Sequence, residues 1–405
     1  MSLGELDLSN SAIAFAGKSD KELQKAAWLF GLMNKPWLVN IGSKVGLWAI
    51  KANIPTVEPI VKATIFEQFC GGTTLANCQT NINKLYEQQV QVVLDYGAEA
   101  KTEAADLDNT RDVLIEALAF AAANESVPVV TLKITGLARF ELLEKIQARK
   151  ESLSAEEKAA FNATLYRLKA IADVAYKHKV ALFIDAEESW IQAAIDGIVT
   201  EMMKVYNKEQ VIIYNTFQMY RHDRLAYLKA AYAAARKDNY FLGAKIVRGA
   251  YMQKERERAE ELGYASPIQV DKAATDADYN KAIRFCVEHY KHIASCNASH
   301  NEASNLLQTQ LMEEKGIPRN HPHLNFCQLY GMSELLTFNL AAVGYNAAKY
   351  MPYGAIKDVV PYLIRRAQEN TSVTGDMSRE LSMIIKEIER RKTAESVTNN
   401  SNTDG

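Results

Sequence analysis

From Gln91 onward, short runs rich in β-branched residues alternate with long amphipathic helical segments, and this alternation constrains the fold more than any other feature. Strict strand–helix alternation favours a parallel sheet, either closed or open and doubly wound. Eight such runs match the strand count of a (β/α)8 barrel. We therefore expect a distorted (β/α)8 barrel over residues 85–392, with the open sheet as the structural alternative. The expected strands are QVVLDYG, PVVTLKITGL, ALFIDAEES, VIIYNTFQ, AKIVRGAYM, SCNASHN, HLNFCQLYG and AAKYMPYG.

The residues before the barrel have a helical pattern. DKELQKAAWLFGLM places Asp20 at the N-cap and apolar residues at helical spacing, and TVEPIVKATIFEQFC is a second helical stretch. We expect a helical N-terminal segment over residues 1–84. At the other end, TAESVTNNSNTDG has no periodic apolar position, so residues 393–405 are expected to be disordered.

The composition argues against several functions. The chain has 405 residues and a net charge of -2, and its sequence has no stretch rich in lysine and arginine. No nucleic-acid partner is therefore expected. Five scattered cysteines form no close metal-type pair and are typical of free thiols in a reducing compartment. No apolar run approaches the roughly 20 residues of a spanning helix, and the N-terminus lacks the basic start and apolar block of a secretion signal. A cytoplasmic location is the resulting expectation.

Polar residues interrupt the ends of the expected strands. Because side chains alternate between the two faces of a strand, these polar residues gather on one face of four successive strands. Lys133 and Asp185 lie on neighbouring strands and can pair, since a buried charge without a partner costs several kcal/mol. A structural ion pair explains any single position equally well. The whole set favours an active site, because enzymes of this fold build their sites at the C-terminal strand ends. The residues of this face are Thr131, Lys133, Thr135, Phe183, Asp185, Glu187, Tyr214, Thr216, Gln218, Lys245, Val247, Gly249 and Tyr251.

Other motifs are less specific. Gly249, directly after Arg248, allows a close approach of backbone to a flat ligand or phosphate, although a turn glycine is the simpler interpretation. His300 has no second histidine at ligand spacing, so no metal is expected. CGGTT, residues 70–74, does not follow a first strand, so a nucleotide cofactor is not expected to bind in the Rossmann manner.

YLIRRAQEN, residues 362–370, places two adjacent arginines on a late helix. Tyr362 lies three residues before Arg365 and Glu369 four residues after it, so the three share one helix surface. Guanidinium groups bind carboxylates in bidentate fashion. On a solvated face, by contrast, Arg365 and Glu369 form only a surface pair worth about 0.3–0.5 kcal/mol.

Together, these motifs resemble the proline dehydrogenase family, flavoenzymes with a distorted (β/α)8 barrel. The resemblance runs from about Gln91 to Asn370, with a weaker helical match before it, and depends on the order and spacing of LDYG, TLKITGL, FIDAEES, YNTFQMY, KIVRGAY, SHN, FCQLYGM, YMPYG and YLIRRAQEN. It implies a monofunctional, FAD-dependent enzyme that oxidises L-proline to Δ1-pyrroline-5-carboxylate, the first step of proline catabolism. It also implies electron transfer to a quinone, with transient contact at the inner membrane as a peripheral protein.

The resemblance carries residue roles onto matching positions. Arg365 and Arg366 are expected to hold the substrate carboxylate, and Lys133 to assist them and pair with Asp185. Tyr350 is expected to pack against the substrate ring. The implied catalytic set is Lys133, Asp185, Lys245, Tyr350, Arg365 and Arg366, and the implied substrate-binding set is Lys133, Tyr251, Leu329, Tyr350, Tyr362, Arg365 and Arg366.

The resemblance also implies a flavin site. Lys245 is expected beside the reactive nitrogen edge of the flavin, where a cation stabilises charge on the reduced ring. Arg248 and His300 are expected nearer the pyrophosphate and the ribityl chain. The matching flavin-binding positions are Gln218, Lys245, Val247, Arg248, Gly249, Ala250, Ser299, His300 and Glu369.

Two positions depart from the family pattern. Many bacterial members read Arg-Leu-Val-Lys where this chain reads Lys-Ile-Val-Arg, residues 245–248, so the two cation types are exchanged, and lysine and arginine differ in hydrogen-bond geometry. Thr73 stands where the family often has an acid that closes over the substrate arginines. A lid built on a Glu–Arg ion pair is therefore not expected.

Hydroxyproline dehydrogenase and a non-catalytic proline-binding barrel are the alternative functions. Tyr350 argues against hydroxyproline, because an added ring hydroxyl would crowd a bulky phenol. The complete set of cationic and flavin motifs argues against a barrel that binds proline without turning it over. An unrelated phosphate-binding barrel would carry a Gly-rich loop after strands seven and eight, where YMPYG offers a single glycine.

Overall fold

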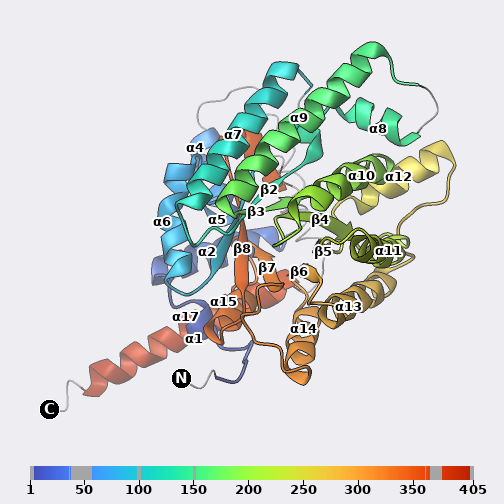
Figure 1. Cartoon of the computed structure of the whole chain (residues 1–405). Coiled ribbons are helices and arrows are strands. Elements are labelled where there is room, and N and C mark those ends of the chain that lie inside the picture. Colours follow the sequence, from blue (N-terminus) through green and yellow to red (C-terminus); the bar gives the residue numbers. More distant parts are fainter. Residues whose placement is uncertain are drawn as a thin grey trace. The chain divides into compact units, whose positions relative to one another are not determined.

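The computed structural model describes residues 4–35, 37, 57–97, 102–148, 152–360, 362–364 and 376–401. Its eight strands close into a barrel in chain order, and neighbouring strands from β1 to β7 pair in parallel (Figure 1). The expected (β/α)8 barrel is thus confirmed, and the open doubly wound sheet is wrong. The strands are β1 Gln91–Tyr96, β2 Val129–Leu132, β3 Ala181–Ile184, β4 Ile213–Gln218, β5 Leu242–Val247, β6 Ile293–Ala298, β7 Leu324–Leu329 and β8 Ala347–Tyr353.

Helices follow the strands in the expected alternation. A strand covered on both faces loses the polar alternation of a half-exposed one, and every residue of β4 and β8 is buried. The helices after β1 to β7 are α7 Ala104–Ala122, α8 Phe140–Ala148, α9 Ala155–His178, α10 Ser189–Tyr206, α11 Arg224–Lys237, α12 Met252–Leu262, α13 Lys272–Glu288, α14 Glu302–Glu314 and α15 Glu334–Ala342.

Some strands are shorter than expected from the alternation of polar and apolar residues in the sequence. β2 ends at Leu132, and the chain then enters a 3₁₀ turn over Ile134–Gly136. β3 ends at Ile184, so Asp185 and Glu187 lie just past it. Strict alternation of faces therefore does not extend to the residues beyond these ends. They occupy the loops at the carboxyl edge of the barrel.

The chain forms two compact units. The barrel unit comprises described residues of 91–328 and 344–350, and the helical unit comprises those of 1–90, 329–343 and 351–405. The helical unit is thus not limited to the expected N-terminal segment of residues 1–84, because later parts of the chain join it. Its helical elements are α1 Ser11–Ala14, α2 Asp20–Met33, α4 Val57–Val61, the π-helical turn Lys62–Phe66, α5 Glu67–Phe69, α6 Leu75–Tyr86, α15 and α17 Asp376–Ser401.

A shared apolar core joins these distant segments within the helical unit. Phe30 of α2 and Phe69 of α5 meet edge to face with ring centroids 6.3 Å apart. Leu363 and Ile384, from the last part of the chain, are buried in the same cluster. Burial of apolar surface is the main stabilising contribution here. Among the described residues, no helix combines the length and apolar character needed to cross a membrane.

Two local expectations were wrong. The N-cap of α2 is Ser19, not Asp20: the Ser19 hydroxyl accepts from the Glu22 N–H and the Glu22 carboxylate accepts from the Ser19 N–H, which forms a capping box. The tail was expected to be disordered from residue 393, whereas α17 continues to Ser401. Residues 402–405 lie outside the described residues.

Glu387 of α17 links the end of the chain to its beginning. Its side chain is fully buried and accepts hydrogen bonds from Ser11, Arg390 and Arg391 at 2.8–2.9 Å. The Arg391 guanidinium also donates to the carbonyl oxygen of Phe15 at 2.8 Å. The hydrogen bond from Arg390, followed by those from Arg391 and Ser11, lowers the pKa of Glu387 to about 2.

We expect Glu387→Gln to lower the free energy of unfolding at pH 7 by about 1–3 kcal/mol, because charge-assisted hydrogen bonds are lost. A lowered pKa contributes stability that is complete above the ordinary value near 4.5 and is lost as the pH falls toward 2. The difference between variant and parent in urea unfolding should therefore shrink between pH 5 and pH 2. Glu389→Gln, at an exposed position on the same helix, is the control and should change little. A difference independent of pH would contradict the assignment.

Candidate active site at the carboxyl ends of the barrel strands

The site centres on a buried ion pair that crosses the barrel. Lys245 of β5 donates from Nζ to Oδ1 of Asp185 at 2.6 Å, and Tyr350 of β8 donates from its hydroxyl to Oδ2 of Asp185 at 2.8 Å. The Lys245 ammonium also lies 4.7 Å from the centroid of the Tyr350 ring. Cations are attracted to aromatic faces, so Tyr350 contacts both members of the pair.

Charge and burial act together on these groups. Burial opposes ionisation of Asp185, but the charges of Lys245 and Lys133 outweigh it and lower the pKa of Asp185. Burial, followed by the negative charges of Asp185 and Asp95, raises the pKa of Tyr350 well above its usual value. Asp185 is therefore a carboxylate and Tyr350 a neutral phenol that donates to it.

A second set of contacts extends the cluster to β1 and β2. The Thr131 hydroxyl donates to Oδ1 of Asp95 at 2.9 Å and lies 3.1 Å from the Tyr350 hydroxyl. The pairing register places Thr131 directly between Asp95 and Phe183. Side chains from four different strands and from the loop after β3 thus meet at one end of the barrel.

Lys133 lies directly after β2, as expected for a residue that faces the site. The positive charge of Lys133 lowers the pKa of Asp185, so the two groups interact electrostatically. The direct ion pair described for Asp185 is with Lys245. A direct contact between Lys133 and Asp185 stays a prediction.

The expected flavin-binding residues form a second group at the ends of β4, β5 and β6. Arg248 donates to the Ser299 hydroxyl oxygen at 2.6 Å, to that of Ser304 at 3.0 Å and to Oδ1 of Asp276 at 2.7 Å. Its guanidinium carbon lies 4.2 Å from the centroid of the Tyr279 ring. The structure therefore brings together two expected residues, Arg248 and Ser299.

Other expected flavin residues lie at or just after the ends of the neighbouring strands β4, β5 and β6. Gln218 ends β4 beside Val247 of β5, and its amide donates to the carbonyl oxygen of Glu187 at 2.7 Å. Gly249 has φ +132°, and a Cβ there would lie 2.4 Å from the Tyr220 ring, so only glycine fits. Ala250 is exposed and His300 half-buried, in the loops after β5 and β6.

The expected substrate residues are placed in part. Tyr251 occupies the N-cap position of α12, in the segment between β5 and that helix, and Leu329 ends β7. Tyr362 is buried in the core of the helical unit. Arg365, Arg366 and Glu369 lie outside the described residues.

Sequence reasoning missed three partners of the site. Asp95 is the last residue but one of β1 and belongs to the same cluster, and the strand-end rule applied to LDYG would have found it. Asp276 and Ser304, which accept hydrogen bonds from Arg248, lie on helices. The search for polar residues at strand ends therefore could not find them.

Thr73, which the resemblance assigns to the place of the family's lid-forming acid, makes a local contact. Its hydroxyl donates to Oδ1 of Asn77 at 2.9 Å. The loop before it is tied to the chain around the end of β8, because the Gly71 N–H donates to the Pro352 carbonyl oxygen at 2.8 Å. A Cβ on Gly71 would lie 2.3 Å from Sδ of Met351, so this close approach depends on glycine.

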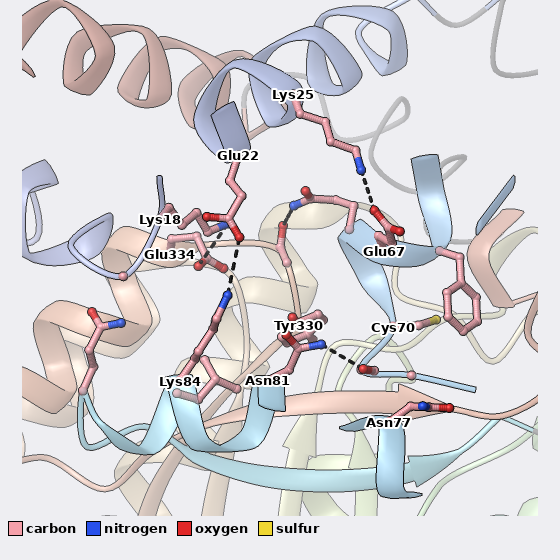
Figure 2. Close-up of a pocket in the computed structure, with 18 of the residues that line it drawn as sticks. Lys18, Glu22, Lys25, Glu67, Cys70, Asn77, Asn81, Lys84, Tyr330 and Glu334 are labelled. Carbon is pink, nitrogen blue, oxygen red and sulfur yellow. Dashed lines mark hydrogen bonds and ion pairs between the residues drawn. The ribbon is translucent and has the colours of Figure 1, made fainter. Parts of the chain in front are cut away.

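A separate cavity of about 480 Å³ lies within the helical unit, and Figure 2 shows side chains that line it. The Asn81 amide donates across one wall to the Gly71 carbonyl oxygen at 2.9 Å. None of the residues expected to bind substrate or flavin belongs to its described lining. Three ion pairs border it: Lys25–Glu67 at 2.5 Å, Lys84–Glu22 at 3.6 Å and Lys18–Glu334 at 3.6 Å.

We expect Lys245→Met to lower the free energy of unfolding by about 3–5 kcal/mol, because it removes the direct partner of a buried carboxylate. The double variant Lys245→Met/Asp185→Asn should recover at least half of that loss. Lys169→Met, which removes an exposed pair with Asp173 at 2.7 Å, is the control and should cost less than about 1 kcal/mol. Urea unfolding measures all three. Equal costs for Lys245→Met and Lys169→Met would contradict the central place given to the buried pair.

Comparisons with known proteins show the family to which the chain belongs. The proline dehydrogenase family model matches residues 78–379. The chain is 32% identical over 401 residues to mitochondrial proline dehydrogenase 1 of Dictyostelium discoideum, covering 88% of this chain and 69% of that protein. It is 29% identical over 426 residues to hydroxyproline dehydrogenase of Xenopus laevis, covering 96% of this chain and 91% of that protein.

A solved structure shares the fold. Proline utilization A from Bdellovibrio bacteriovorus, inactivated by N-propargylglycine, superposes with a TM-score of 0.70 at 21% identity. The match covers 90% of this chain and 38% of that longer chain. From the family model and the relatives together, the chain belongs to the proline dehydrogenase family, a family of oxidoreductases that act on proline.

Proposed function

We propose that this chain oxidises L-proline to Δ1-pyrroline-5-carboxylate, with bound FAD as the redox cofactor and a quinone as the electron acceptor. The observation that carries the proposal is the buried Lys245–Asp185 pair with Tyr350. The sequence resemblance implies that these three residues belong to the family's site. The strand ends of a (β/α)8 barrel are also where enzymes of this fold place their reacting groups.

Tyr350 is suited to orient the substrate ring. Its hydroxyl is held by Asp185 and lies beside Thr131, so the plane of its ring is fixed before substrate binds. Lys133, Arg365 and Arg366 supply the positive charge for the substrate carboxylate in this proposal. Holding the ring and the carboxylate fixes the carbon that reacts, and proximity supplies most of the rate enhancement.

The described residues fit a flavin dinucleotide. Such a ligand needs polar groups around a flat ring and cationic groups near a diphosphate. Gln218, Lys245, Arg248 and Ser299 place an amide, an ammonium, a guanidinium and a hydroxyl at the ends of three neighbouring strands. Gly249 adds a stretch of backbone without a side chain next to Arg248.

When bound, FAD would accept the hydride from the ring carbon next to the proline nitrogen. The neutral nitrogen lone pair assists its departure, and the nitrogen proton leaves to give the neutral imine of Δ1-pyrroline-5-carboxylate. Protein groups position and shield the reacting atoms, and no protein nucleophile is needed. Lys245 holds positive charge at the site through its contact with Asp185.

The proposed location is the cytoplasm, with transient contact at the inner membrane where a quinone is reached. All five cysteines are free and buried, which is compatible with a reducing compartment. The quinone is proposed from the family resemblance.

Hydroxyproline is the second candidate substrate, because the chain resembles a hydroxyproline dehydrogenase over most of its length. The position of Tyr350 disfavours it. The phenol is fixed at both its ring and its hydroxyl, so it cannot move aside cheaply for a hydroxylated substrate. A non-catalytic proline-binding barrel is the third candidate and predicts binding without electron transfer.

We expect the purified protein to show a flavin absorbance spectrum that proline bleaches under anaerobic conditions. The kcat/KM for proline should exceed that for hydroxyproline, because Tyr350 crowds the added hydroxyl. Stopped-flow absorbance near the flavin maximum measures both. An equal or higher kcat/KM for hydroxyproline would favour the second candidate, and proline binding to a colourless protein would favour the third.

Arg365→Met should raise the KM for proline at least tenfold, because a charge-assisted bidentate contact with the carboxylate is lost. Flavin content should stay near that of the parent protein. Steady-state kinetics and the ratio of flavin to protein absorbance check the two expectations. Loss of flavin with an unchanged KM would show that the arginine serves the cofactor instead.

A further inference from the structure

We infer that Glu187 is a positioning residue for substrate binding: its carboxylate fixes the turn that follows β2 and thereby sets the place of Lys133. The inference goes beyond the roles assigned above, which give Glu187 none. It depends on the proposed function in one respect, namely that Lys133 contributes to binding of the substrate carboxylate.

The backbone on both sides of Lys133 is tied to the loop after β3. On one side, the Asp185 N–H donates to the carbonyl oxygen of Leu132 at 2.9 Å. On the other side, the Thr135 N–H donates to Oε1 of Glu187 at 3.1 Å, and the Thr135 hydroxyl donates to Oε2. Lys133 is therefore held between two attachments, and one of them is the Glu187 carboxylate.

Glu187 is itself fixed by its own backbone. Its N–H donates to Oε1 of Gln192 on α10 at 2.7 Å, and its carbonyl oxygen accepts from Gln218 at the end of β4 at 2.7 Å. Gln192 in turn donates to Asp196 at 3.0 Å, and Arg224 donates to Asp196 through its two terminal guanidinium nitrogens at 2.6 and 3.0 Å. A buried polar network thus anchors Glu187, so its carboxylate is a rigid point of attachment.

The carboxyl group of Glu187 is shielded from water. The residue is 3% exposed, and Thr135 is 4% exposed. Burial raises the pKa of Glu187 to about 7, against the opposing effect of the Thr135 hydrogen bonds and the Lys133 charge. The two Thr135 donors replace hydration at this carboxyl, and this is the geometry expected of a structural clamp on the turn.

Loss of the clamp should act on the substrate carboxylate and not on the reacting ring. Without it, the turn over Ile134–Gly136 loses its attachment to the loop after β3, and the Lys133 ammonium samples a wider range of positions. Lys245 and Tyr350 keep their contacts with Asp185, because none of those contacts involves Glu187. The expected signature is therefore a raised KM with a nearly unchanged kcat.

The test compares four variants of the flavin-loaded protein. Glu187→Ala removes the clamp. Glu187→Gln keeps it, since an amide accepts from the Thr135 N–H and donates to the Thr135 hydroxyl oxygen. Thr135→Val removes one of its two bonds. Thr309→Val is the matched control, because it removes a buried threonine hydroxyl that donates to the Leu306 carbonyl oxygen at 2.8 Å, on α14 and outside the clamp.

Four quantities are measured for each variant. They are KM and kcat for proline, the Kd of cyclopentanecarboxylate from its perturbation of the flavin spectrum, and the Tm. Cyclopentanecarboxylate keeps the ring and the carboxylate but has no nitrogen, so it reports carboxylate binding without turnover.

We expect Glu187→Ala to raise the KM and the Kd about tenfold, which equals about 1.4 kcal/mol and is typical of a lost buried hydrogen bond. The kcat should stay within about twofold, as expected when only binding common to ground and transition states is lost. Glu187→Gln should restore both constants to within about threefold, and Thr135→Val should raise both constants by an intermediate factor. Thr309→Val should lower the Tm alone.

A lowered Tm with unchanged KM and Kd in Glu187→Ala would overturn the inference and leave Glu187 a purely structural residue. Equal losses in Glu187→Ala and Glu187→Gln would also overturn it, since charge and not hydrogen bonding would then be responsible. If Glu187→Ala does not fold, an unchanged Kd in Thr135→Val overturns it. A parent protein whose flavin is not bleached by proline would instead refute the proposed function, while the Kd comparison still tests the clamp.

Discussion

The ion pair between Lys245 and Asp185 is the interaction on which the site depends. Its two charges are 2.6 Å apart in a largely buried setting, and either alone would cost several kcal/mol. β3 and β5 are not neighbours, because β4 lies between them, and Tyr350 comes from β8. Closure of the barrel brings these three side chains together. The contacts of the site therefore depend on the closed topology of the sheet.

The second group of polar residues lies around Arg248 and extends the site. It makes its own ion pair with Asp276, separate from the buried pair of Lys245 and Asp185. Arg248 has a carboxylate, two hydroxyl partners and an aromatic face as neighbours, and it remains partly exposed. A buried lysine–aspartate pair and a half-exposed arginine suit different tasks. In the proposed reaction the first lies by the reacting ring and the second by the phosphates of the cofactor.

The fold was predictable because eight β-rich runs and their helices are local patterns, and closure follows from their number. The site was predictable in part, since polar residues at strand ends stand out against apolar strands. Lys245 was not recognised as the direct partner of Asp185, because only neighbouring strands were compared and side chains also meet across the barrel. The full extent of the helical unit was not predictable from local patterns, since contacts such as Gly71 with Pro352 join residues far apart in sequence.

A crystal structure of the flavin-loaded protein with cyclopentanecarboxylate bound would test the central claim most directly. The account predicts the carboxylate within hydrogen-bonding distance of Lys133, Arg365 and Arg366, with the ring against Tyr350 and the Lys245–Asp185 pair intact beside it. A carboxylate bound elsewhere, with both guanidinium groups directed to bulk solvent and far from Lys133, would contradict it.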